Sequence, residues 1–366
     1  MKKLRASYIL PIRRRQIEPD AELSAYLHWL AAQIDVVVVD GSPPEVFAAH
    51  AEQWPADLTH LPPDPTLDSA NGKVRGVLTG LRAARHERLV LADDDVRYDQ
   101  PALTRIVALL DRAAIVRPQN YFDRLPWHAR WDTARSLLNR ATGGDWPGTL
   151  AVRRSLLLAT GGYDGNVLFE NLELVRTIRA AGGVEAVPLD LFVRRRPASP
   201  PHFWSQRVRQ AYDEFARPVR LTISLLALPL TLALLVGRRW RTLLAGIAAL
   251  IGLAELGRRR GDGRRVFPAS TTLLAPAWVA ERAVCIWLAL GSRLLIGGVR
   301  YHGGVLRSAA TPLRTLRQRH KAVRLRVERG ELPSDENDQQ RHDTNSRDLT
   351  SIAADVKESA TQTATI

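Results

Sequence analysis

The chain has 366 residues, which is enough for two domains and a sizeable core, so a mini-protein is excluded. Its one cysteine, Cys285, leaves no pair for an intrachain disulfide, and we expect the soluble part of the chain to be cytosolic. A formal net charge of +14 predicts an anionic partner, which is nucleic acid, a lipid headgroup or a phosphorylated substrate.

The first part of the chain alternates predicted strands and helices. In chain order they are a strand over 8–12, a helix around 23–30, a strand over 35–40, a helix over 72–85, a strand over 88–92, a helix over 101–112 and a strand over 113–117. The apolar run 8–12 is too short for the apolar core of a signal peptide, so it is interpreted as the first strand. The alternation predicts an α/β fold with a mostly parallel sheet, whose binding site lies beyond the carboxyl ends of the strands.

Acidic residues follow two of these strands. Asp40 ends one strand, and Asp93, Asp94 and Asp95 follow another. Adjacent aspartates at the end of a buried strand repel one another unless a cation or basic groups neutralise them. We expect Mg²⁺ or Mn²⁺, bound by one or two carboxylates and by substrate phosphates; a solvated loop that caps the helix at Pro101 is the alternative.

The segment 117–139 is rich in aromatic residues and arginine. It follows the last predicted strand, where a lid or an acceptor loop is expected. In that position His128 and Trp131 would face the acceptor, and the alternative for His128 is a polar surface residue.

Apolar residues are concentrated between 219 and 299. The stretches 221–237 and 240–257 are predicted to cross a bilayer. A third stretch, 273–297, contains polar residues that return to one face of a helix, namely Glu281, Arg282, Ser292 and Arg293. This pattern favours a helix at the membrane interface over a third span.

Arginines flank the apolar stretches, at 194–196, 238–239, 258–260 and 264–265. This placement is typical of membrane-flanking loops, so lipid headgroups are favoured over nucleic acid, for which no reading element is recognised. Residues 300–329 are also basic, which predicts that they lie on the same side of the membrane as the N-terminal domain. The polar residues 331–366 predict a disordered tail.

Several motifs occur in order along residues 7–215. They are YILPIR, VVVVDGSP, NGKVRGVLTGLRAA, LVLADDDVRY, GTLAVRRSLLLATGGYDG, FENLELVRTIRAAGG and QRVRQ. Together they resemble the family 2 glycosyltransferases, with LVLADDDVRY at the place of the DxD motif and QRVRQ at that of the QxxRW motif. The resemblance implies a GT-A catalytic domain over 1–205, membrane-associated helices over 206–300 and a basic juxtamembrane segment over 301–330.

The same resemblance implies a hexosyltransferase-like enzyme that takes a sugar from a nucleotide-sugar donor and inverts its anomeric centre. Asp95 and Asp93 are then expected to bind the Mg²⁺ or Mn²⁺ ion. The residues expected to contact the donor are Asp40, Ser42, Lys73, Asp93, Asp94, Gln206 and Arg209.

Two positions depart from the family pattern. Where the family usually has an aspartate as the base, the pair is Glu170-Asn171. Because an amide cannot accept a proton, the expected base is Glu170; the alternatives are an impaired enzyme or Glu173, which is otherwise expected to be a surface carboxylate. Gln210 replaces the tryptophan of the QxxRW motif, so Trp204 either stacks on the acceptor instead or anchors the chain at a membrane.

The expected function is inverting, metal-dependent transfer of a sugar to a membrane-embedded lipid acceptor, on the cytosolic face of a bacterial inner membrane. One alternative is a processive polysaccharide synthase, against which the missing tryptophan and the few apolar stretches argue. The other is a non-catalytic sugar-nucleotide-binding protein, because of Asn171. An oxidoreductase is disfavoured, since no G-x-G-x-x-G follows the first strand.

Overall fold

Short apolar and β-branched runs form a seven-stranded central sheet. The computed structural model describes residues 3–18, 20–301 and 304–331. The strand order is β3-β2-β1-β4-β8-β6-β9. The bounds of these strands are β1 Leu4–Ile12, β2 Ile34–Asp40, β3 Thr59–Leu61, β4 Arg88–Ala92, β6 Ile115–Val116, β8 Thr149–Arg153 and β9 Glu185–Ala186.

The prediction of a mostly parallel sheet is confirmed. Strands β3, β2, β1 and β4 are parallel, and β6 and β9 are parallel to each other. Strand β8 was not predicted, and it runs antiparallel to both β4 and β6. A second sheet has the order β5-β10-β7, formed by β5 Val96–Arg97, β10 Phe192–Arg195 and β7 Gln119–Phe122.

Helices cover both faces of the central sheet, because side chains alternate between its faces along each strand. Tyr8 and Leu10 of β1 pack in one core with apolar residues of α1 (Ala21–Gln33) and α4 (Gln100–Leu109). Ile9 packs in a second core with residues of α3 (Gly72–Ala83), α6 (Arg154–Ala159) and α7 (Glu170–Ala180). A further helix, α2 (Pro44–Gln53), connects β2 to β3.

Two glycines allow α3 to approach the sheet closely. A Cβ atom on Gly76 would lie 2.7 Å from Cβ of Pro11, and one on Gly80 would overlap Ile9. In contrast, a Cβ atom on Gly72, at the start of the same helix, would meet no atom within 4 Å. This difference separates the steric effect of a methyl group from its effect on helix propensity.

We therefore predict that Gly80→Ala lowers the free energy of unfolding by about 1–3 kcal/mol relative to Gly72→Ala, the usual effect of overpacking. Denaturant unfolding of the full chain measures the two values. Equal stability of the two variants would contradict the close packing of α3 on β1.

A loop was expected over the segment 117–139, but its second half is helical. It forms β7 and then most of the helix α5 (Trp127–Thr142), whose Ala134 and Leu137 are buried against apolar residues of later helices. His128 is buried and donates to the carbonyl of Ala198 at 2.7 Å, and Trp131 donates to Glu281 at 2.8 Å. The alternative of a polar surface residue is wrong for His128, because its ring is buried.

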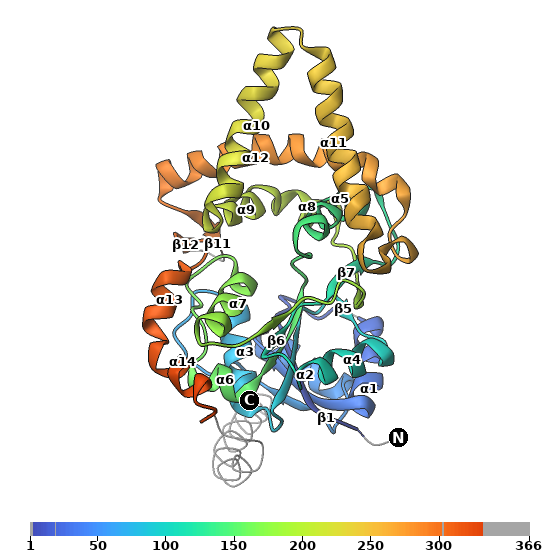
Figure 1. Cartoon of the computed structure of the whole chain (residues 1–366). Helices are drawn as coiled ribbons and strands as arrows, with labels where there is room; N and C mark the ends of the chain where they lie inside the picture. Colours follow the sequence, from blue (N-terminus) through green and yellow to red (C-terminus); the bar gives the residue numbers. More distant parts are fainter. Residues whose placement is uncertain (1–2, 19, 302–303, 332–366) are drawn as a thin grey trace.

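Three long apolar helices follow two short ones, α8 (Pro200–Ser205) and α9 (Arg207–Tyr212). They are α10 (Pro218–Val236), α11 (Trp240–Arg259) and α12 (Ala275–Ile296), with the short 3₁₀ turns η1 (Asp213–Ala216), η2 (Arg260–Arg265) and η3 (Ala269–Leu274) between elements. Figure 1 shows α10 and α11 projecting together from the α/β domain, with α12 lying across their base. All three are long and apolar enough to cross a membrane.

The three helices differ in how much apolar surface the protein itself covers. None of the apolar stretch of α10 is buried, whereas 39% of the stretch that ends with α12 is buried. The charged residues of α12 turn toward the α/β domain: Glu281 contacts Trp131, and Arg282 is buried. The expectation that the third helix lies at the membrane interface stays a prediction.

The chain then returns to the α/β domain. The hairpin of β11 (Val299–Tyr301) and β12 (Gly304–Leu306) leads to α13 (Leu313–Arg319), which packs on α7, and to α14 (Lys321–Glu328). The amide of Phe169 donates to the carbonyl of Ala309 at 2.8 Å. The described residues of the basic segment 301–330 therefore lie on the same side of α10 and α11 as the α/β domain (Figure 1). Apart from Glu331, the predicted tail 331–366 lies outside the described residues.

Candidate active site

The residues singled out at the strand ends meet at one edge of the central sheet. Strands β1, β2 and β4 are parallel neighbours, so the chain after Ile12, after Asp40 and after Ala92 emerges on the same side. The backbone N–H of Arg14 donates to Oγ of Ser42 at 2.8 Å. Ser42 thus fixes the loop after β1 against the loop after β2.

Each of the three adjacent aspartates has a basic partner from a different part of the chain. Asp93 lies 2.6 Å from Nζ of Lys73, Asp94 lies 2.5 Å from Arg14, and Asp95 lies 2.8 Å from Nε of Arg195. Pairing of β10 with β5 brings Arg195 to this edge. Basic groups of the protein therefore offset the mutual repulsion of the aspartates. The expectation that residues 194–196 form a membrane-flanking loop is wrong for Arg194 and Arg195, which belong to β10. Arg14 was not singled out from the sequence.

Asp95 has one carboxylate oxygen that is free of hydrogen bonds to the described part of the chain. Its Oδ1 atom is buried and has no hydrogen-bond partner among the described residues. Burial raises the pKa of the Asp95 carboxyl; the charge of Arg195 opposes this shift, and that of Asp93 adds to it. Among the described residues no group of three His, Cys, Asp or Glu side chains is placed to hold a metal ion. A cation here would have two carboxylates and would need further oxygens from a ligand.

Asp40 is enclosed by histidines. Its buried carboxylate accepts from His50 at 2.6 Å, from His60 at 3.2 Å and from the backbone N–H of Ser42 at 2.9 Å. Although burial opposes ionisation, these hydrogen bonds hold the pKa of Asp40 well below its usual range. His60 in turn stacks on Phe47 with ring centres 3.9 Å apart. The side chain of Asp40 thus faces the protein, and the predicted contact with the donor remains a prediction.

Lys73 connects the aspartates to the predicted base. It lies in the first turn of α3, and its ammonium group is 2.6 Å from Asp93 and 2.7 Å from Glu170. Burial by itself lowers the pKa of Lys73, but the charges of Asp93 and Glu170 outweigh that effect and raise it. The lysine therefore stays charged at neutral pH.

Glu170 begins α7, and its side chain is 17% exposed. The adjacent Asn171 donates to the carbonyl of Pro147 at 3.0 Å, which is a structural contact. The expectation that Glu173 is a surface carboxylate is wrong: Glu173 is buried and accepts from the backbone N–H of Thr311 at 2.6 Å. Burial raises the pKa of Glu173, and its bond to Thr311 opposes that rise. Of these three residues, Glu170 is the one that reaches Lys73.

The two predicted donor contacts from the QRVRQ motif point to different places. Arg209 lines the same cavity as Glu170 and lies over the ring of Tyr301, at 5.3 Å from its centre. Gln206 borders a neighbouring groove, and its side-chain amide donates to Ser205 at 3.2 Å. Gln210, at the position of the missing tryptophan, also lines the cavity beside Glu170.

That cavity has a volume of about 200 Å³ and extends from Asp93 and Glu170 to Arg282 of α12. It contains a carboxylate that sequence reasoning missed, Asp213, which begins the 3₁₀ turn before α10. Burial raises the pKa of Asp213 to about 7, although the charge of Arg217 acts against it. The apolar residues Tyr212 and Phe215, close to Asp213 in the chain, are the signal in the sequence that could have indicated its burial.

The raised pKa predicts that Asp213→Asn stabilises the protein only at higher pH. The unfolded chain releases this proton near pH 4 and the folded protein near pH 7, so ionisation of Asp213 lowers stability progressively between these values. We expect the Tm of Asp213→Asn to exceed that of the wild type at pH 8 and to equal it at pH 4. A difference in Tm that does not change with pH would contradict the burial of this carboxyl.

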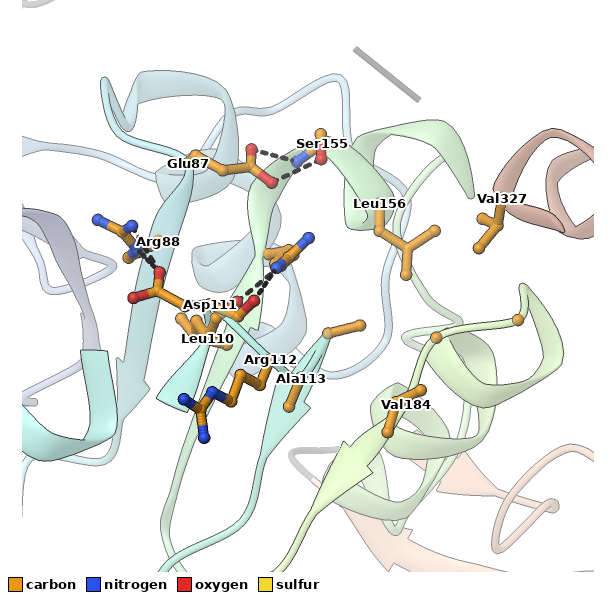
Figure 2. Close-up of a pocket in the computed structure, with 14 residues that line it drawn as sticks. Glu87, Arg88, Leu110, Asp111, Arg112, Ala113, Ser155, Leu156, Val184 and Val327 are labelled. Atoms are coloured by element: carbon orange, nitrogen blue, oxygen red, sulfur yellow. Dashed lines mark hydrogen bonds and ion pairs between the residues drawn. The ribbon is translucent and has the colours of Figure 1, made fainter. Parts of the chain in front are cut away.

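A larger cavity of about 490 Å³ lies at the opposite edge of the sheet, where β4 begins (Figure 2). Four of its five charged groups have partners: Arg88 pairs with Asp111 at 2.6 Å, Glu87 accepts from the hydroxyl of Ser155 at 2.6 Å, and Arg153 donates to the carbonyl of Leu110 at 2.8 Å. Such pairing is typical of structural contacts. The charged groups that converge from distant segments lie at the other edge, beside Asp93.

Among known proteins, this chain shows similarity to solved structures only. No family model and no curated protein matches the chain. The chain is similar to the mannosyltransferase PcManGT from Pyrobaculum calidifontis, solved with GDP-Man and Mn²⁺, at 19% identity over 90% of this chain and 87% of that one, with a TM-score of 0.41. It is also similar to mannosyl-3-phosphoglycerate synthase from Rubrobacter xylanophilus, at 15% identity over 59% and 74% of the two chains, with a TM-score of 0.41.

A third solved structure is glucosyl-3-phosphoglycerate synthase from Mycobacterium tuberculosis in complex with Mn²⁺, UDP and glucosyl-3-phosphoglycerate. Its identity to this chain is 15% over 56% of this chain and 77% of that one, with a TM-score of 0.37. Identities below 20% and TM-scores below 0.5 give no basis for assigning the donors or acceptors of these proteins to this chain.

Proposed function

We propose that the protein is a metal-dependent glycosyltransferase that moves a sugar from a nucleotide-sugar donor to a lipid acceptor, with inversion at the anomeric carbon. The observation that carries this proposal is the position of Lys73, whose one ammonium group contacts both Asp93 and Glu170. It places the residues expected to hold the donor diphosphate next to the expected base. Inverting transfer requires that combination of groups.

Asp95 and Asp93 are the proposed ligands of Mg²⁺ or Mn²⁺. The unpartnered Oδ1 of Asp95 fits this role, because hard cations take carboxylate oxygens together with phosphate oxygens and water. When bound, the ion would offset the charge that develops on the departing nucleoside diphosphate. Lys73 and Arg195 flank the same carboxylates and would contribute positive charge beside the diphosphate. The remaining proposed donor contacts are Asp40, Ser42, Asp94, Gln206 and Arg209.

In the proposed reaction an acceptor hydroxyl attacks the anomeric carbon from the face opposite the diphosphate. Its proton passes to Glu170, the bond between the anomeric carbon and the phosphate oxygen breaks, and nucleoside diphosphate leaves. Lys73 holds Glu170 in the lining of the cavity, so the carboxylate has a fixed position when the acceptor arrives. Asn171 takes no part, since its amide is bound to Pro147.

A bacterial inner membrane, with the catalytic domain on the cytosolic side, is the proposed location. Helices α10 and α11 leave the α/β domain together, and α13, which follows α12, packs back on α7 of that domain. Because the chain returns to the side from which it left, it must cross the membrane an even number of times. Two crossings by α10 and α11, with α12 at the interface, satisfy that requirement. Trp204 and Trp127 are 54% and 50% exposed, and the centres of their rings lie 5.8 Å apart. Exposed tryptophans of this kind are expected of aromatic anchors at a membrane surface.

The proposal is tested with detergent-solubilised full-length protein. The protein is incubated with a set of nucleotide sugars and Mn²⁺ or Mg²⁺, and the released nucleoside diphosphate is measured with and without a lipid extract. We expect release that requires both the metal and the lipid fraction. Tight donor binding without release of nucleoside diphosphate for any acceptor would instead favour a non-catalytic sugar-nucleotide-binding protein. This is the second candidate function, because Asn171 stands where an aspartate base is usual.

A further inference from the structure

The cavity beside Glu170 is lined by more basic groups than its acids can neutralise. Its acidic residues are Asp93, Glu170, Asp213 and Glu214. Its arginines are Arg135, Arg195, Arg209, Arg217, Arg220 and Arg282. Two of the four carboxylates are bound by Lys73, and Arg135 and Arg195 are paired with Asp145 and Asp95 outside the lining of the cavity. The four remaining arginines therefore share two carboxylates, those of Asp213 and Glu214. The excess of positive charge predicts an anionic ligand.

Arg282 is the most unusual of these arginines. It is only 4% exposed, and its Nε and Nη1 atoms have no hydrogen-bond partner within the part of the chain that the structure describes. Its guanidinium carbon lies 5.0 Å from the ring centre of Trp278, one turn earlier in α12. The neighbouring Glu281 does not neutralise it by contact, because that carboxylate accepts from Trp131 at 2.8 Å. A buried guanidinium with unused donors is unfavourable unless a ligand completes it.

Two further arginines reach the cavity from the start of α10. Arg217 and Arg220 share Glu214, each at 3.3 Å, and Nε of Arg217 also has no partner among the described residues. One carboxylate therefore faces two guanidinium groups. Together with Arg282, these residues offer several N–H donors to one small polar space. Phosphate matches them best, because guanidinium groups bind its oxygens in pairs.

The position of the cavity indicates which substrate carries the phosphate. The donor diphosphate is assigned to the aspartates after β4, and one of them, Asp93, lies at one end of the cavity. The other end is formed by residues of α12 and of the start of α10. Figure 1 shows α10 projecting from the α/β domain and α12 lying across its base. A molecule that reached Glu170 from this end would bring an apolar tail along these helices.

We infer that this cavity binds a phosphate group carried by the lipid acceptor, held by Arg217, Arg220 and Arg282. The inference rests on the proposed function, because it names the class of acceptor: an anionic lipid whose phosphate lies close to the group that receives the sugar. Arg282 is then a substrate-binding residue, and α12 supplies part of the acceptor site as well as a surface for the membrane.

Binding is tested without any sugar transfer. Thermal unfolding of the full chain in detergent micelles is followed while phosphatidic acid, diacylglycerol with the same acyl chains, or inorganic phosphate is added. We expect phosphatidic acid to raise the Tm with a saturable dependence on concentration, and diacylglycerol to leave it unchanged. Inorganic phosphate is expected to bind far more weakly, because it lacks the tail.

Two variants connect this binding to the cavity. Arg282→Gln and Arg217→Gln are each expected to weaken phosphatidic acid binding at least tenfold, the order expected for losing hydrogen bonds to a charged group. Arg241→Gln is the matched control, since Arg241 is exposed at the start of α11 and does not line the cavity. If Arg282→Gln does not fold, Arg282→Lys and Arg217→Gln carry the test.

Three results would overturn the inference. They are equal binding of phosphatidic acid and diacylglycerol, binding of inorganic phosphate as tight as that of phosphatidic acid, and unchanged lipid binding by the arginine variants. Weaker nucleoside diphosphate binding by Arg282→Gln would likewise assign the cavity to the donor. Lipid binding that depends on Arg282 in a protein that transfers no sugar would leave the inference standing while the proposed function fails.

Discussion

Replacing Glu170 by glutamine is expected to lower kcat for sugar transfer by about two to four orders of magnitude, the usual contribution of a general base. Glutamine keeps the size of the side chain and its place in the first turn of α7, but it cannot accept a proton. Lys73 keeps its 2.6 Å contact with Asp93, so the fold and donor binding are expected to persist. Steady-state transfer at saturating donor measures the loss.

Glu45→Gln is the matched control, because Glu45 is an exposed glutamate in the first turn of another helix, α2. Its kcat is expected to equal that of the wild type. Normal transfer by Glu170→Gln, with intact donor binding, would remove the assignment of the base. Asp213→Asn would then be the next variant to assay, since Asp213 lines the same cavity.

The elements that carry the aspartates and Lys73 could be predicted from the sequence. The predicted strand 88–92 coincides with β4, and the predicted helix 72–85 begins at the first residue of α3. Both predictions depend on patterns within one segment: a short apolar run that ends in aspartates, and apolar residues at helical spacing. Parallel pairing of β1 with β4 then brings the strand ends to one edge.

The partners of these residues could not be predicted, because they come from distant segments. Arg195 reaches Asp95 only because β10 pairs with β5, and Arg282 reaches the cavity only because α12 lies across the base of α10 and α11. In a chain with so many arginines, no local pattern distinguishes these two. Identifying them required the three-dimensional contacts.

The segment 117–139 shows a different limit. Its aromatic residues and arginines indicated a loop that faces an acceptor, yet most of α5 lies within it. Ala134 and Leu137, three residues apart, form the buried stripe that packs against later helices, and this spacing was present in the sequence. In this segment the helical periodicity indicates the secondary structure, whereas the composition does not.

Asp95→Asn is expected to reduce transfer about a thousandfold or more, because a bound cation contributes several kcal/mol to stabilising the transition state. The amide keeps the shape of the side chain but removes the charge that two-carboxylate binding of Mn²⁺ requires. Mn²⁺ affinity, measured by calorimetry on the full chain in detergent, is expected to fall together with the transfer rate. Arg195 retains Asp93 at 3.7 Å, which limits the loss of stability.

Asp68→Asn provides the comparison, since Asp68 is exposed and lies outside the cavity beside Glu170. Both Mn²⁺ binding and transfer should be unchanged in it. If Asp95→Asn kept wild-type Mn²⁺ affinity and wild-type transfer, Asp95 would not be a metal ligand. Arg14, Lys73 and Arg195 would then be the groups left to neutralise the donor diphosphate, because they already neutralise the three aspartates in this structure.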